Sequence, residues 1–203
     1  MNNMASRSSK LICPHSTANS SARISHAELE RHIGRPMPVW VIGHSLRGYL
    51  LLLTPRRLSS LFNRHRYQDV FNMVPHEFAH LLINRIVGYP GVPEVPVWLH
   101  EGLATYLAGQ QSRGDQAVRD GARRGTLPTL QQLDESWAQQ AQIGYVMSHS
   151  IVNYLIEKYG PERILSLLKA LADGTKFDAA LQQVIGIDRP ALEQEWREWL
   201  LGG

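Results

Sequence analysis

The chain has 203 residues, a length typical of one domain with a sizeable hydrophobic core. Its hydrophobic content of 43% is ordinary for a soluble globular protein. The formal net charge is only +3, and the sequence has no basic and aromatic stripe and no nucleic-acid-binding motif. We therefore exclude nucleic acid as an expected partner.

The first 22 residues are rich in Ser and Asn and contain no acidic residue, which predicts a disordered or non-core tail. They lack the apolar stretch of a secretory signal, and the chain has no run of the roughly 20 apolar residues that a transmembrane helix needs. The single cysteine, Cys13, excludes an internal disulfide framework and fits a reducing compartment. The compartment stays open, and the lack of a visible signal peptide and transmembrane helix favours a cytoplasmic location. We expect one domain over residues 23–203.

The organised part of the chain is expected to begin with a short helix and two strands. Ser25-His26-Ala27-Glu28 has the form of a capping box, and Gly34 and Pro36 are typical of a helix end. Apolar, partly β-branched segments follow at 39–42 and 49–54, and each predicts a strand. Together these segments predict a small N-terminal sheet.

The next expected element is a helix that begins near Tyr67 and ends before Gly88. Pro75 lies inside this segment, so either the helix bends there or it begins at Pro75 as its first residue. We favour the longer, bent helix because Val70, Phe71 and Val74 continue its apolar face.

This helix carries the motif His76-Glu77-Phe78-Ala79-His80. Two histidines four residues apart lie on one helix face, about one turn apart, so both imidazoles can bind a single tetrahedral Zn²⁺. Glu77, beside the first histidine, can then act as a general base at the open coordination position. The motif therefore indicates a zinc site and supplies two of its protein ligands, so the third ligand must come from elsewhere in the chain.

A second helix, expected over residues 97–110, is connected to the first by a segment rich in Gly and Pro. Gly102 lowers the stability of this helix, and we interpret it as the place where the second helix packs closely on the first. The stretch Trp98-Leu99-His100-Glu101-Gly102-Leu103-Ala104 offers two candidates for the third ligand, His100 and Glu101. Adjacent helical residues point about 100° apart, so only one of the two can face the metal.

The remainder of the chain is expected to be a polar loop followed by helices. Residues 111–126 are polar and contain Gly and several arginines, which predicts a loop on the surface. Helices are predicted over 127–137, 142–159, 162–172, 177–184 and 191–201. Trp196 and Trp199 in the last helix are expected to be core residues. Tyr145 and His149 lie one turn apart in the long helix, so His149 is a candidate second proton donor.

Three stretches together resemble the gluzincin zinc metallopeptidases, the superfamily of thermolysin and aminopeptidase N, and in particular its peptidase MA-like branch. They are HEFAH (76–80), WLHEGLA (98–104) and GYVMSHSIVNYLIEKYG (144–160). The resemblance implies an α+β, zincin-like single domain with a small N-terminal sheet, an HExxH active-site helix and a helical C-terminal half. It also implies that residues 47–54 form a strand that pairs with an extended substrate.

The resemblance assigns roles to individual residues. His76, His80 and Glu101 would bind one Zn²⁺ per chain, which favours Glu101 over His100 as the third ligand. Glu77 would be the general base, and Tyr145 would donate a hydrogen bond to the oxyanion of the tetrahedral intermediate. Ser148 stands three positions after that tyrosine, where the family often has glycine or another small residue.

The expected function is zinc-dependent hydrolysis of a peptide or protein substrate. The alternative is a catalytically silent zincin-like domain that serves binding or assembly and keeps zinc as a structural part. A third interpretation, a helical interaction domain without metal, requires all three ligands to be coincidental. Glu77 favours the enzyme, because a purely structural zinc site does not need that carboxylate.

Overall fold

The structure is a computed structural model that describes residues 26–34, 36, 43–46, 49–52, 67–88, 95–110 and 115–202. The tail predicted over residues 1–22 lies outside the described residues. The strands are β1 (Gly43–Leu46) and β2 (Tyr49–Leu52). The helices are α1 (His26–Ile33), α3 (Tyr67–Val87), α4 (Val97–Leu107), α5 (Asp115–Arg124), α6 (Leu130–Glu135), α7 (Trp137–Tyr159), α8 (Pro161–Ala172), α9 (Phe177–Val184) and α10 (Arg189–Leu201). Within this described part, none of the helices is long and apolar enough to cross a bilayer.

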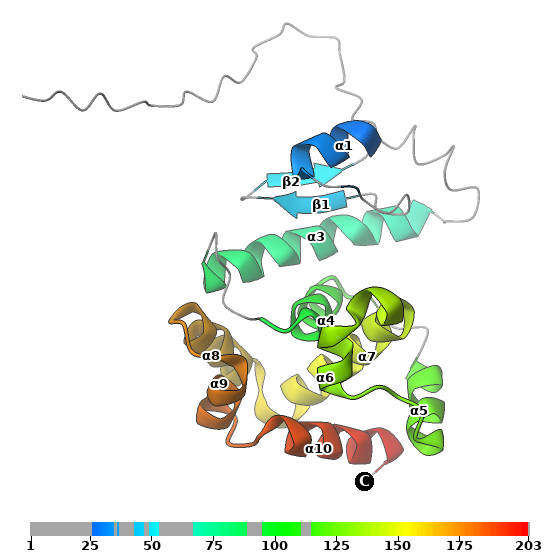
Figure 1. Cartoon of the computed structure of the whole chain (residues 1–203), viewed down its shortest axis with the longest axis vertical. Coiled ribbons are helices and arrows are strands. Elements are labelled where there is room, and N and C mark those ends of the chain that lie inside the picture. Colours follow the sequence, from blue (N-terminus) through cyan, green and yellow to red (C-terminus); the bar gives the residue numbers. More distant parts are fainter. Residues whose placement is uncertain are drawn as a thin grey trace, which may run out of the picture.

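Helix α3 lies between two groups of elements (Figure 1). The hairpin of β1 and β2, together with α1, is on one side of it, and helices α4 to α10 are on the other. The helix contacts β1, β2, α4 and α8, and α4 packs most extensively against α7. As predicted, α3 begins at Tyr67 and continues through Pro75.

The prediction of an α+β fold with a small N-terminal sheet was wrong. Among the residues whose side chains the structure describes there is no strand, and these residues are overwhelmingly helical. The backbone of the hairpin pairs four residues with four, from Gly43 opposite Leu52 to Leu46 opposite Tyr49. Two strands of this length do not form a layer that can cover a core. The first strand expected, over 39–42, lies outside the described residues.

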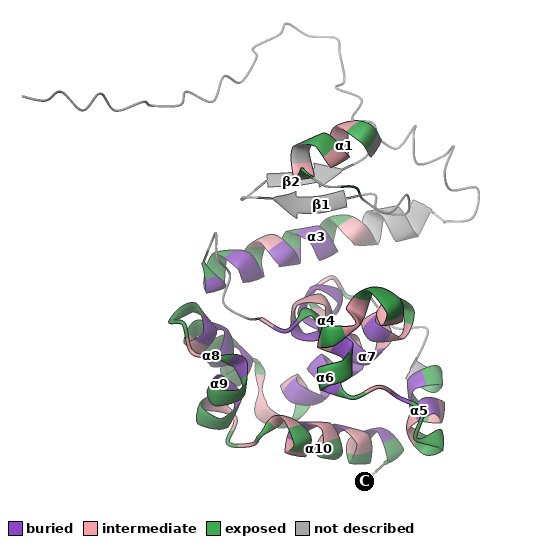
Figure 2. Ribbon diagram, in the orientation of Figure 1, coloured by how far each residue is buried: buried purple, intermediate pink, exposed green. Residues whose placement is uncertain are grey.

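The core is instead formed by helices packed on helices. Its centre lies in α4 and α7, where buried residues are concentrated (Figure 2). The largest fully buried side chains of these two helices are Trp98, Leu99, Met147, Ile151 and Leu155. Trp196 of α10 is also fully buried and donates from its indole to Ser150 Oγ at 3.1 Å, so its prediction as a core residue is confirmed. Trp199 is only half-buried, against the ring of Tyr154 at 5.7 Å.

The prediction of a loop over residues 111–126 was wrong for 115–124, where the chain forms α5 (Asp115–Arg124). Residues 111–114 lie outside the described residues. The helix is amphipathic: Val118 is fully buried, Gly121 is buried, and the three arginines are exposed. The buried face contacts α7 and α10. The polar composition hid this face, because it has only one large apolar residue.

Gly102 does mark a close helix contact, but the partner is α7 and not α3 as predicted. A Cβ built at Gly102 would lie 2.7 Å from Val152 Cγ2 and would also collide with the backbone carbonyl of Ser148. Backbone cannot move aside as easily as a flexible side chain. Glycine at this position therefore allows α4, which carries Glu101, to sit directly on α7, which carries Tyr145.

We expect Gly102→Ala to lower the free energy of unfolding by about 1–3 kcal/mol, the usual cost of overpacking a well-packed core. The measurement is urea denaturation followed by circular dichroism. Gly121→Ala is the matched control, because the three atoms nearest the built Cβ all belong to side chains, with Leu127 Cδ2 at 2.5 Å and Thr126 Oγ1 at 3.7 Å. Equal losses in the two variants would contradict the backbone contact as the cause.

Candidate metal centre

Two helices bring two imidazoles and one carboxylate together. His76 and His80 are buried on one face of α3, one turn apart, and Glu101 approaches from α4, just after its first turn. Glu101 Oε2 is 3.3 Å from His76 Nε2 and 3.5 Å from His80 Nε2. The ligand atoms of the three residues all lie within 4.8 Å of one another, which is close enough for a single metal ion to bind between them.

The environment of Glu101 tests whether a cation fits there. Burial opposes ionisation of this carboxyl, but the nearby imidazoles of His76 and His80 outweigh burial and lower its pKa to about 2. Its Oε2 atom is buried and accepts no hydrogen bond of good geometry from the residues that the structure describes, although both imidazole nitrogens are near. A buried carboxylate oxygen without a full partner is costly, and a divalent cation between the three groups removes that cost.

The His76 ring is oriented by Gln110, just beyond the end of α4. His76 Nδ1 lies 3.2 Å from Gln110 Oε1, so the ring donates its proton there. That tautomer leaves the lone pair of Nε2 free for a metal ion. The sequence analysis missed Gln110, since its place beside His76 depends on where α4 ends.

Tyr145 of α7 is half-buried near both candidate carboxylates. Burial raises the pKa of its phenol, and the charges of Glu101 and Glu77 raise it further. Its ring packs edge-on against Trp137 at 5.2 Å between centroids. Gly144 makes this contact possible, because a Cβ there would lie 2.8 Å from the Trp137 ring. Glu77 itself is buried on α3, next to His76.

His100 lies at the cluster but outside the ligand set. Its ring stacks on that of His80, and its Nε2 atom is 3.0 Å from Asn84 Oδ1. Burial and the neighbouring His80 lower its pKa to about 4, against the opposing effect of Glu101, so the ring is neutral at pH 7. Asn84 was also missed, although it stands four residues after His80 and so shares its helix face.

The remaining candidate, His149, is half-buried one turn beyond Tyr145 on α7. Its ring lies 6.5 Å from that of Tyr106, tilted by 34°. A role for His149 as a second proton donor stays a prediction.

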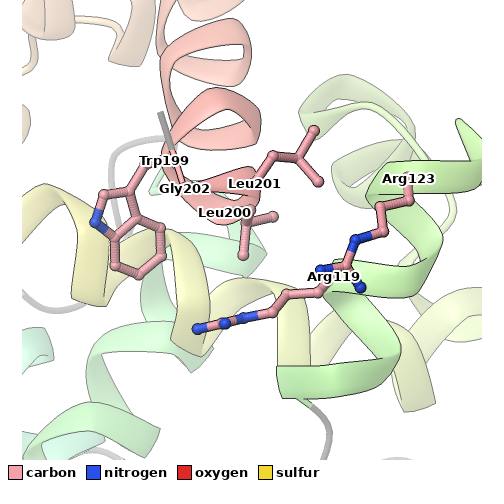
Figure 3. A pocket seen from close by; sticks show the side chains of 6 residues that line it. All are labelled: Arg119, Arg123, Trp199, Leu200, Leu201 and Gly202. Atoms are coloured by element: carbon pink, nitrogen blue, oxygen red, sulfur yellow. The ribbon is translucent and has the colours of Figure 1, made fainter.

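A separate cavity of about 270 Å³ lies between α5 and the end of α10 (Figure 3). Arg119 and Arg123 line one side, and Trp199, Leu200, Leu201 and Gly202 line the other. None of these residues belongs to the cluster of His76, His80 and Glu101. The candidate metal centre is therefore separate from this cavity.

Comparison with known protein families gives one match. A family model described as Peptidase MA superfamily matches residues 70–202, about two thirds of the chain. The match spans most of α3 and all of α4 to α10, so it contains all the residues of the cluster. No curated protein and no solved structure matches the chain.

Proposed function

This chain belongs to the Peptidase MA superfamily, and we propose that it is a zinc-dependent peptidase of the gluzincin type. His76, His80 and Glu101 would hold the zinc ion. Two imidazoles and one carboxylate are a known catalytic zinc ligand set, which leaves a fourth position for water. When bound, zinc supplies an acidified water molecule and polarises the substrate carbonyl.

The observation that carries this proposal is the convergence of two imidazole nitrogens on one buried carboxylate oxygen, at 3.3 and 3.5 Å. The nitrogens come from one helix and the oxygen from another, and Gln110 orients the His76 ring with its Nε2 toward the shared centre. Such outer hydrogen bonds are typical of histidines that bind metal.

Two further side chains would carry the proton and charge movements. Glu77 would accept a proton from the attacking water and then deliver it to the leaving amine. Tyr145 would donate a hydrogen bond to the carbonyl oxygen as negative charge develops on it. Its raised pKa supports this role, because the phenol stays protonated, and so remains a donor, at neutral pH and well above it.

Metal removal tests the proposal. We expect about one zinc ion per chain after exhaustive dialysis, cleavage of a mixed peptide pool, loss of cleavage on chelation, and recovery when Zn²⁺ is added back. Elemental analysis measures the metal, and sequencing of the products by mass spectrometry measures the cleavage. His80→Ala is expected to lose both metal and cleavage.

The possible results separate the three interpretations. A protein that retains no metal would contradict the metal centre itself. A protein that keeps one zinc ion, loses it in His80→Ala and yet cleaves no peptide would instead indicate a catalytically silent binding or assembly domain.

A further inference from the structure

The two proposed histidine ligands are oriented in different ways. His76 is held by a hydrogen bond from its Nδ1 atom to Gln110 Oε1. His80 differs: its Nδ1 atom is buried and has no hydrogen-bond partner among the described residues. An imidazole without a second hydrogen bond is free to rotate about its side-chain torsions unless packing prevents it.

Packing against His80 comes from His100 on α4. The two rings are nearly parallel, with centroids 4.4 Å apart and an angle of 11° between their planes. His76, by contrast, meets His80 edge-on at 89°, so it does not restrict the plane of the His80 ring in the same way. His100 is the neighbour that covers the flat face of the His80 imidazole.

His100 is itself fixed at its far edge. Its Nε2 atom lies 3.0 Å from Asn84 Oδ1, so the ring donates its Nε2 proton to Asn84, one turn after His80 on α3. Because this nitrogen donates its proton to Asn84, it is not available to bind a metal ion. The contact also ties α4 back to α3 at the level of the site.

We propose that His100 is a positioning residue that sets the plane of the His80 imidazole by stacking, so that Nε2 of His80 faces the shared metal position. The inference rests on the proposed metal centre and deepens it. It assigns to His100 a role distinct from that of a ligand and from that of a general acid or base.

Two variants separate the ring from its hydrogen bond. His100→Phe keeps a flat ring on His80 and loses the bond to Asn84, whereas His100→Gln keeps a polar group toward Asn84 and loses the ring. Zinc affinity is measured by competition with a chromophoric chelator. We expect His100→Gln to bind zinc about 10-fold more weakly than the wild type, the lower end of the usual effect of outer residues. We expect His100→Phe to stay close to the wild type.

Cobalt substitution gives a readout that a general loss of stability would not change. The visible absorption bands of Co²⁺ depend on ligand geometry, and we expect them to shift in His100→Gln and to stay in place in His100→Phe. Leu103→Ala is the control, because Leu103 is a buried core residue of the same helix. It is expected to lower the stability of the fold and to leave zinc affinity and the Co²⁺ spectrum unchanged.

The outcomes are distinguishable from failure of the metal centre. The proposed function fails if the wild type binds no zinc, or if His80→Ala binds zinc as the wild type does. If the wild type binds zinc and both His100 variants match it in affinity and spectrum, only the positioning role is overturned. If His100→Phe binds zinc more weakly than the wild type and His100→Gln binds it equally well, stacking is overturned as the cause.

Discussion

Glu77→Gln is expected to lower peptide turnover by about 10²–10⁴-fold while zinc stays bound, which is the usual contribution of a general base. The amide of Gln has nearly the same shape as the carboxylate but does not accept a proton at neutral pH. Glu77 lies beside His76 on α3 and is not one of the three groups whose atoms converge. The variant therefore removes proton transfer without removing a proposed ligand.

The measurement is the initial rate of cleavage of one peptide chosen from the library, together with zinc content and zinc affinity. Glu162→Gln is the control, because Glu162 is exposed in the first turn of α8. A Glu77→Gln protein that holds zinc and cleaves at the wild-type rate would contradict Glu77 as the base. A loss of zinc in this variant alone would instead place Glu77 among the metal-binding residues.

The local part of the candidate site could be predicted from the sequence, because it depends on helix periodicity. Residues four apart share a helix face, so His76 and His80 could be placed together before any fold was known. Glu101 required more, since its position depends on how α4 returns to α3. The adjacent-residue argument left His100 and Glu101 as alternatives, and the structure brings the Glu101 oxygen to both imidazoles while His100 stacks beside them.

The parts that the sequence analysis missed depend on tertiary packing. The hydrogen bond from His76 to Gln110 joins residues 34 positions apart, and nothing in the local pattern marks Gln110 as its partner. Gly102 indicated a close helix contact in the sequence, but only the packed structure identifies α7 as the neighbouring helix. The predicted fold class was wrong for a related reason. Short apolar segments near the N-terminus were interpreted as a sheet that defines the fold class.

The second large effect is expected at Tyr145. Tyr145→Phe removes one hydroxyl from a half-buried ring and leaves the edge-on contact with Trp137 available. If the phenol donates to the developing oxyanion, its loss should lower kcat by about 10²–10³-fold, as for other donors of this kind. KM should change little, because the charge on that oxygen develops mainly in the transition state.

The measurement is kcat and KM for the same peptide across a range of pH. Burial and the charges of Glu101 and Glu77 raise the pKa of Tyr145 above its ordinary value of 10.0, so the phenol stays protonated below that pH. We therefore expect the wild type and Tyr145→Phe to differ by a constant factor up to about pH 10, without a tyrosine-dependent decline. Tyr159→Phe is the matched control, since the Tyr159 hydroxyl donates to Glu195 on α10 at 2.7 Å. A wild-type kcat in Tyr145→Phe, or an equal loss in Tyr159→Phe, would assign the oxyanion contact to another group.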